Sequence, residues 1–287
     1  MSFVERHGVT APDSPVLVLG LEGWIDAGFA AATAVATLLE QIDTERYASF
    51  DADELMDRRA RRPRLRLDDG VRSEITWSDP QVLVGVDRLG SGIAILTGAE
   101  PDYRWRAFST AVADLAVEIG ARLVVGLGGF PTATPHTRPV RLASTASSPA
   151  LAHKVGFIPG SIDVPAGIAD VIGATCSEAG IPSVGLWARV PHYVAGMAFT
   201  PAALALLEGL AAVSGVLVDV DDLRESAAAA RLRVDELIAQ SSEHLAMVRQ
   251  LEEQVGDGDD LQVLGAEDLP SGDEIAAELE RYLRGEA

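Results

Sequence analysis

Short apolar runs, four or five residues long and bounded by Gly, Pro or Asp, recur along the first two-thirds of the chain. Their length and their β-branched residues predict β-strands. The predicted strands are Val16–Leu19, Val82–Val86, Ile93–Leu96, Leu123–Leu127 and Ser183–Trp187.

Three stretches between these runs have helical character. Gly28–Gln41 is rich in alanine, Trp105–Gly120 has apolar residues at helical spacing, and Gly167–Ala179 is the third. Strands that alternate with helices are typical of crossover units. The sequence therefore predicts an α/β fold of three layers, in which helices cover both sides of a mostly parallel sheet.

A segment at about residues 63–78 breaks this alternation. Asp69-Gly70 separates two candidate strands that start at Leu65 and end at Trp77, which predicts an inserted β-hairpin. Six arginines without any lysine adjoin it, which raises the alternative of a nucleic-acid patch. We favour a hairpin that pairs with another subunit, or whose arginines meet carboxylates. These arginines are Arg58, Arg59, Arg61, Arg62, Arg64 and Arg66.

The chain changes character after residue 200. Residues 201–287 hold 20 acids and 6 bases, a net charge of −14, against −6 for the first 200 residues. Thr200-Pro201 is typical of a helix start, and a long helix is predicted from Asp219–Asp222 to Val255. We expect an α/β core in residues 1–200 and an acidic helical extension in 201–287, either a lid or a solvated appendage.

The predicted extension has an apolar side and two further signals near its end. An acidic, glycine-containing link spans residues 256–260, and Ser271 with Glu274 forms a capping-box pattern before a last helix. The apolar side is made by Leu223, Ala227, Leu232, Leu237, Leu245, Val248 and Leu251.

Composition limits the partners and the compartment. The formal net charge of −20 disfavours nucleic acid, and the single Cys176, expected to be buried, excludes an intrachain disulfide framework. The N-terminal residues lack the apolar core of a signal peptide, and Glu22 and Asp26 interrupt the apolar stretch Val16–Leu39. We expect a cytoplasmic protein without a membrane segment.

The first candidate site follows the first predicted strand. Glu22, Trp24 and Asp26 lie among three glycines, at the strand end where ligands bind in doubly wound folds. Glu22 is a candidate base or hydroxyl acceptor, and Trp24 a stacking platform or a core aromatic. Asp26 is equally well explained as the cap of the next helix.

The second candidate site is the Gly-, Thr- and Pro-rich segment 126–139. We expect Gly128 and Gly129 to expose amides, and Thr132, His136 and Arg138 to add a hydroxyl, a titratable ring and a fixed cation. Such a set suits a phosphate, a carboxylate or an oxyanion. A rigid loop whose His and Arg bond to the backbone explains it as well.

Weaker candidates lie at two other strand ends. His192 follows the strand at Ser183–Trp187, and Glu100 follows the strand at Ile93–Leu96, where helix-start chemistry explains it equally well. His136, His192 and His153 lack zinc-site spacing, and neither a dinucleotide fingerprint nor a hydrolase elbow occurs. We expect no metal and no cofactor.

Four motifs together resemble the PAC2 family, over about Val16 to Thr200. They are Gly23–Gly28, Gly98–Pro101, Gly128–Thr132 and Pro135–Pro139, in the order and spacing of that family. The arginine-rich composition, with Lys154 as the only lysine, is compatible with an actinobacterial member.

The resemblance implies a phosphorylase/hydrolase-like core, a homo-oligomer with a trimer as one candidate, and a ligand pocket at these loops. It implies no catalytic set, and the family name comes from proteasome assembly chaperones. Two hypotheses follow. The first is an oligomeric chaperone or scaffold with a pocket for a small polar or anionic ligand and a protein partner. The second is a hydrolase- or nucleoside-phosphorylase-like enzyme that uses a carboxylate and His136.

Overall fold

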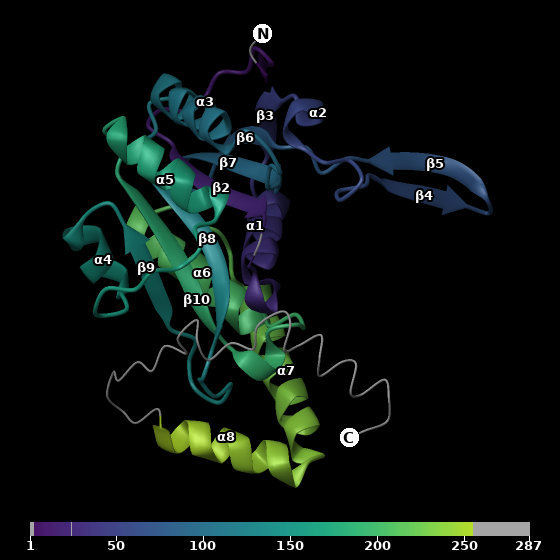
Figure 1. Cartoon of the computed structure of the whole chain (residues 1–287), viewed down its shortest axis with the longest axis vertical. Helices are drawn as coiled ribbons and strands as arrows, with labels where there is room; N and C mark the ends of the chain where they lie inside the picture. Colours follow the sequence, from purple (N-terminus) through teal and green to yellow (C-terminus); the bar gives the residue numbers. More distant parts are fainter. Residues whose placement is uncertain (1–2, 24, 255–287) are drawn as a thin grey trace.

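In a computed structural model, which describes residues 3–23 and 25–254, the chain forms an α/β structure around an eight-stranded sheet (Figure 1). All five predicted strands are present, as β2, β6, β7, β8 and β10. In chain order the strands are β1 (Val4–Arg6), β2 (Val16–Glu22), β3 (Thr44–Phe50), β6 (Gln81–Val86), β7 (Gly92–Ala99), β8 (Leu123–Thr132), β9 (Leu142–Ala146) and β10 (Ser183–Pro191).

The sheet has the strand order β1-β3-β6-β7-β2-β8-β10-β9. Its four central strands are parallel, with Val16 of β2 beside Ile93 of β7 and Leu123 of β8, and Val184 of β10 beside Val125. The outer pairings are antiparallel. The sheet is therefore mixed, and the predicted parallel pairing occupies its centre.

Helices cover both faces of the sheet, as predicted. The three predicted helices correspond to α1, α3 and α5, each within two residues of the expected ends. The helices described are η1 (Ala27–Phe29), α1 (Ala30–Gln41), α2 (Ala52–Leu55), α3 (Trp105–Glu118), α4 (Pro149–Val155), α5 (Ile168–Glu178), η2 (His192–Val194), α6 (Thr200–Ser214), α7 (Asp221–Ala239) and α8 (Ser242–Gln254).

The core lies on both sides of the central strands, and this explains why the strand runs are continuously apolar. Successive side chains of a strand point to opposite faces. Val16 and Val18 accordingly join the cluster with α1 and α6, whereas Leu17 and Leu19 join the cluster with α3 and α5. A run buried on both faces has no polar alternation to show.

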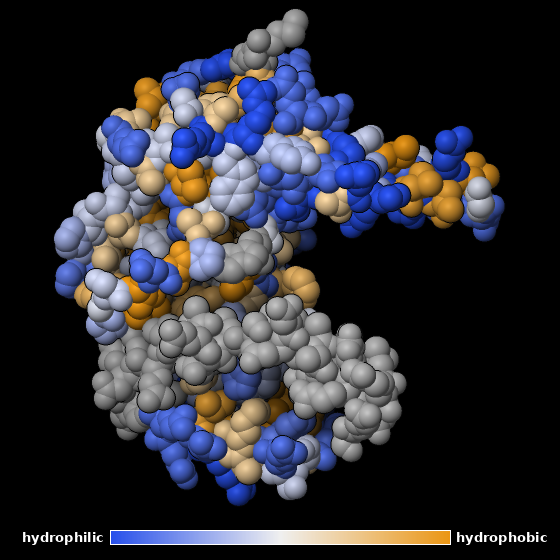
Figure 2. Space-filling model, viewed as in Figure 1, coloured by the Kyte–Doolittle hydropathy of each residue, from blue (hydrophilic) through white to orange (hydrophobic). Residues whose placement is uncertain are grey.

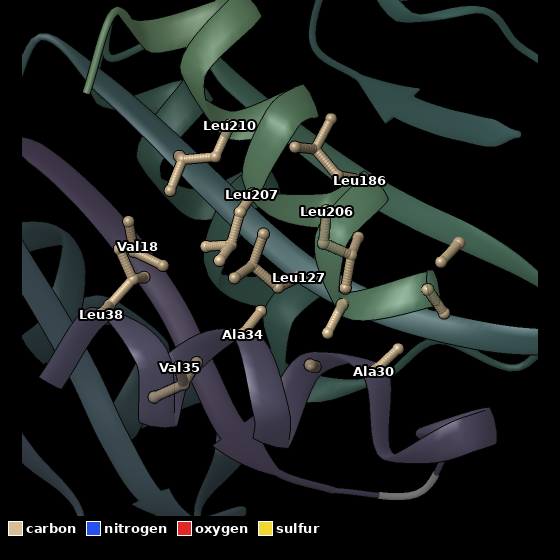
Figure 3. Packing of buried hydrophobic residues seen from close by; sticks show 14 of the residues in the cluster. Val18, Ala30, Ala34, Val35, Leu38, Leu127, Leu186, Leu206, Leu207 and Leu210 are labelled. Carbon is tan, nitrogen blue, oxygen red and sulfur yellow. The ribbon is translucent and has the colours of Figure 1, made fainter. Parts of the chain in front are cut away.

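The alanines of α1 allow this helix to lie close to the sheet (Figure 3). Gly20 of β2 is part of the same close approach, because a Cβ there would stand 2.2 Å from the Val35 Cγ2 atom. The buried residues at this contact include Val18, Ala30, Ala34, Leu38, Leu127, Leu186, Leu206, Leu207 and Leu210.

The predicted hairpin is present as β4 (Arg64–Asp68) and β5 (Val71–Thr76), which pair with each other in a separate two-stranded sheet. It projects from the body of the molecule as an arm (Figure 1). All the residues of both strands are exposed. Figure 2 shows apolar side chains along this arm and hydrophilic ones at its base.

The predicted long C-terminal helix is wrong, because the chain forms two helices there. After α7 ends at Ala239, Ser241 caps α8 by accepting a hydrogen bond from the His244 amide at 3.3 Å. Leu232, Leu237 and Leu245 of the predicted apolar side are exposed, because α7 turns Ala230, Val234 and Ile238 inward instead. Residues 255–287, with the acidic link and the Ser271 capping box, lie outside the described residues.

The first helix after residue 200 packs on the sheet. α6 lies against β10 and beside α1, α7 packs on α6, and α8 packs on α7. The division of the chain at residue 200 stays a prediction. No helix in residues 3–23 or 25–254 is long and apolar enough to cross a bilayer.

Cys176 provides a test of the α5 layer. The thiol is fully buried, and burial raises its pKa to about 11, so at pH 8 it is protonated as well as shielded. In the time that DTNB takes to label the urea-unfolded chain with one equivalent, we expect the native chain to remain unlabelled. Equal labelling rates in the two states would contradict the buried position of Cys176.

Candidate functional site

Several of the predicted site residues lie along the edge of the sheet where the central parallel strands end. Glu22 is the last residue of β2 and lies in register with Ala99, the last residue of β7. The Glu100 amide donates to the Glu22 carbonyl oxygen at 2.8 Å. The first and fourth candidate segments are therefore neighbours.

Glu100 ties this edge to a helix. Its side chain is buried, and its Oε1 atom accepts a hydrogen bond from the Ile168 amide, at the start of α5, at 3.0 Å. A carboxylate is favourable at a helix N-terminus. Gly23 gives it room, since a Cβ there would stand 2.7 Å from the Glu100 Oε2 atom. The helix-start explanation accounts for this residue.

Glu22 lies in a different environment, because it is exposed and lines a cavity of about 390 Å³ at the base of the arm. We call this cavity the arginine basin. It is also lined by Met56, Arg58, Ala60, Arg61, Arg62, Pro63, Arg64, Ser78 and Ala99.

Arginines at the base of the arm form ion pairs with carboxylates, which is one of the two alternatives predicted for them. Arg58 binds Asp79 at 2.8 Å and Asp53 at 3.1 Å, and its guanidinium lies 4.6 Å from the centre of the Trp77 ring. Arg61 binds Asp102 at 3.1 Å. Because Trp77 follows the second strand of the arm, these contacts fix its base.

Asp26 caps α1, one of the two predicted roles. Its carboxylate accepts from the Ala31 amide at 2.7 Å and the Ala32 amide at 2.9 Å. Burial raises the pKa of this carboxyl in spite of the amide donors. The Asp26 backbone also forms a parallel bridge with Gly129, so the first and second candidate segments lie side by side.

The expected amide-exposing loop at Gly128 and Gly129 is wrong. β8 continues to Thr132, and its whole second half pairs with β10. The glycines permit close packing instead. A Cβ on Gly128 would stand 2.4 Å from the Trp187 ring, and one on Gly129 would stand 2.7 Å from the Ala27 carbonyl oxygen.

His136 connects the core to the C-terminal helices. The buried ring lies between Tyr193, whose hydroxyl is 2.7 Å from Nδ1, and Asp235 of α7, whose Oδ1 atom is 2.9 Å from Nε2. The Tyr193 oxygen also accepts the His136 amide at 2.7 Å. A neutral ring with its proton on Nε2 satisfies all three bonds. The neighbouring Thr137 hydroxyl donates to Glu252 of α8 at 2.5 Å.

Tyr193 is a neutral donor in this chain of hydrogen bonds. Burial, with the nearby carboxylates of Glu252 and Asp235 as smaller causes, raises its pKa to about 12. At neutral pH the Tyr193 hydroxyl is therefore uncharged and keeps the proton with which it donates a hydrogen bond to the His136 ring. These hydrogen bonds join the 133–139 loop to α7.

The remaining candidates are dispersed. Thr132 ends β8 and its hydroxyl donates to the Val190 carbonyl oxygen at 3.4 Å, whereas Arg138 and His192 are exposed. The His192 ring contacts Tyr193 edge-on, with centroids 5.3 Å apart. Trp24 lies outside the described residues. Within those residues, no three His, Cys, Asp or Glu side chains gather in a metal-binding group.

A second cavity, of about 420 Å³, lies near the start of β8 and β10. Gly126 and Gly185, neighbours in register, leave the sheet face bare there, and α5 offers small residues such as Gly173. Trp187 and Thr145 line it as well. None of the nine predicted site residues that the structure describes lines this cavity.

Sequence reasoning missed two kinds of partner. The six arginines were assigned to the hairpin, yet four of them line one cavity with Glu22, which comes from a separate part of the chain. Asp235 carries no motif, since an acid on an acidic helix looks like any solvated residue. Only the pairing of His136 with Tyr193 had a signal, because both follow the ends of neighbouring strands.

Fold and site together define a class: an α/β protein with polar groups along the carboxyl edge of its sheet, a projecting β-arm and helices docked at His136. The PAC2 family model matches residues 20–238, and the chain belongs to the PAC2 family. Among curated proteins, none matches the chain closely enough to count.

Three solved structures illustrate the kinship. A PAC2 family protein from Streptomyces avermitilis is 39% identical, with a TM-score of 0.73 over 82% of this chain and 99% of that one. The Mycobacterium tuberculosis proteasome-assembly chaperone homologue Rv2125 is 35% identical, with a TM-score of 0.74 over 81% and 99%. The M. tuberculosis protein Rv2714, of unknown function, is 34% identical, with a TM-score of 0.81 over 88% and 90%.

The His136 contacts can be tested against His192, a nearby histidine that is exposed. We expect His136→Ala to lower the free energy of unfolding by roughly 1–3 kcal/mol, because it leaves the hydroxyl of the partly buried Tyr193 without its acceptor. Trypsin should then cut faster at Arg231 and Arg233 of α7. Urea unfolding and limited proteolysis measure both effects. If His192→Ala behaves like His136→Ala, the docking role is refuted.

Proposed function

We propose that this chain acts as an oligomeric, chaperone-like or scaffold-like protein, which holds a protein partner and takes a small polar or anionic ligand at the carboxyl edge of its sheet. The arm formed by β4 and β5 carries this proposal. The arm exposes large apolar side chains to solvent, with Leu67 56% and Ile75 51% accessible. Exposed apolar patches mark surfaces that bind other proteins.

The arm has the properties of an element that associates. Two-stranded hairpins are at best marginally stable in water, and within the described residues β4 and β5 pair only with each other. Leu65 lies opposite Ile75, and strand alternation places Leu67 on the same face, so three apolar side chains share one side of the arm with Arg72, which lies opposite Leu67. A second copy of the arm offers the same apolar face and unpaired strand edges. Self-association through this face would bury the apolar side chains of both copies.

Kinship supports the chaperone-like part of the proposal. The 35% identical relative from M. tuberculosis is described as a proteasome-assembly chaperone homologue. We extend to this chain the general role of helping other proteins to assemble, without a particular partner. The alternative of an enzyme requires Glu22 and a histidine at one cavity. Glu22 lines the arginine basin, whereas His136 is bound to Tyr193 and Asp235, so no contact in the described residues favours that alternative.

Paired substitutions on the two faces of the arm test self-association. Leu65→Ser with Ile75→Ser removes the apolar face, and we expect the mass measured by light scattering to fall from a multiple of the chain mass to the single-chain mass. Arg66→Ser with Glu74→Ser alters the paired positions on the other face and should keep the wild-type mass. A monomeric wild type, or equal behaviour of both variants, would contradict the proposal. Circular dichroism checks that each variant is folded.

A further inference from the structure

The arginine basin lies where the topology of the sheet opens a crevice. Glu22 ends β2 and Ala99 ends β7, and these residues are neighbours in register. The chain then continues from β2 to α1 and from β7 to α3, two helices that cover opposite faces of the sheet. Ligands of open α/β sheets bind at such a divergence, outside the carboxyl ends of the strands.

Two of the four arginines in the basin have their charge matched by carboxylates. Arg58 pairs with Asp53 and Asp79, and Arg61 pairs with Asp102. The side chains of Arg62 and Arg64, in contrast, have no hydrogen bond or ion pair within residues 3–23 and 25–254. Their guanidinium donors are available to a ligand.

Positive charge is concentrated near the basin, although the chain as a whole is acidic. Residues 58–66 hold six of the 23 basic residues of a protein whose net charge is −20. A cleft lined by one sign of charge raises the local concentration of ligands of the opposite sign. With four arginines and one glutamate among its lining residues, the basin has an excess of positive charge and is suited to attract an anion to a protein whose net charge is −20.

Glu22 limits which kinds of anion suit the basin. Its carboxylate lines the same cavity and has no hydrogen-bond or ion-pair partner in the described part of the chain. An ionised carboxylate only accepts hydrogen bonds, so it would repel a bare phosphate but would bind a hydroxyl group. The ligand that satisfies both sets of side chains carries an anionic group and hydroxyl groups.

The size and polarity of the basin agree with a small molecule of this kind. Its volume of about 390 Å³ is within the range of about 300–1,000 Å³ that is usual for small-molecule sites. Among the described residues, its walls are formed mainly by arginines, Glu22 and Ser78, with Met56 as the largest apolar side chain. An acyl chain would find little apolar surface here.

We infer that the arginine basin binds a small phosphate ester with free hydroxyl groups, of the sugar-phosphate type; the inference deepens the proposed ligand edge and rests on it. The forked donors of Arg62 and Arg64 match the oxygens of a phosphate, which arginine binds through two parallel hydrogen bonds. Glu22 accepts a hydrogen bond from a hydroxyl group of the same molecule and so favours a phosphate ester over inorganic phosphate. The Arg58 and Arg61 ion pairs hold the walls in place.

Titration calorimetry on the full chain, with glucose 6-phosphate, inorganic phosphate and glucose as probes, tests this assignment. We expect saturable binding of glucose 6-phosphate, weaker binding of inorganic phosphate and none of glucose. Arg62→Ala with Arg64→Ala should weaken glucose 6-phosphate binding by more than about tenfold. Arg59→Ala is the matched control, because Arg59 lies in the same cluster, is highly exposed and does not line the basin.

Glu22→Gln separates the two halves of the proposed site. The variant should bind glucose 6-phosphate several-fold more weakly, and inorganic phosphate as well as or better than the wild type, because it loses a negative charge. Parallel losses for both probes would refute the hydroxyl contact. Unfolding in urea should be nearly unchanged, since this exposed side chain has no partner in the described residues.

Three results would overturn the inference: no saturable binding of glucose 6-phosphate, equal affinity for inorganic phosphate, or equal losses in the Arg59 control and the double variant. Light scattering on the same samples keeps this test separate from the proposed assembly. A wild-type chain that is oligomeric but binds none of the probes would refute the ligand and leave the arm proposal intact.

Discussion

Burial of the central strands on both faces is the constraint on which the rest of the structure depends. Val16, Leu17, Val18 and Leu19 alternate between two clusters, so helices must cover both sides of the sheet. The chain can supply these helices only if it leaves neighbouring strands in opposite directions. It does so after β2 and β7, and this divergence creates the crevice in which the arginine basin lies. The position of the candidate site thus follows from the need to bury the sheet.

Close backbone approach at the carboxyl edge has a second consequence. Gly128 lies beneath the Trp187 ring and Gly129 lies against the Ala27 carbonyl, which allows β8 to continue to Thr132 beside β10. The following loop therefore starts further from the centre of the sheet and reaches α7. There the His136 ring joins Tyr193 to Asp235. The glycines that were predicted to form an anion-binding loop instead position the contact that docks the C-terminal helices.

The accuracy of the sequence-based predictions followed the local strength of each signal. β2, β7 and β8 were predicted because a fully buried strand is apolar at every position. β1, β3 and β9 were not, because they lie toward the edges of the sheet, and Thr44–Phe50 and Leu142–Ala146 mix polar and apolar residues. The Asp-Gly turn marked the arm. The break between α7 and α8 was not predicted, because the composition of this segment is typical of a helix throughout. Ser241 lies at the break and caps α8.

The sequence by itself determined the α/β class, the core strands and helices, the arm and the resemblance to the PAC2 family, because each depends on residues close together in the chain. It also identified most of the polar groups at the strand ends. Only the tertiary structure decided how these groups combine. Glu22 lines the same cavity as arginines some forty residues away, and His136 binds Asp235 of α7 rather than a second site histidine. Such contacts depend on strand order and on the packing of distant helices, which no local pattern of residues specifies.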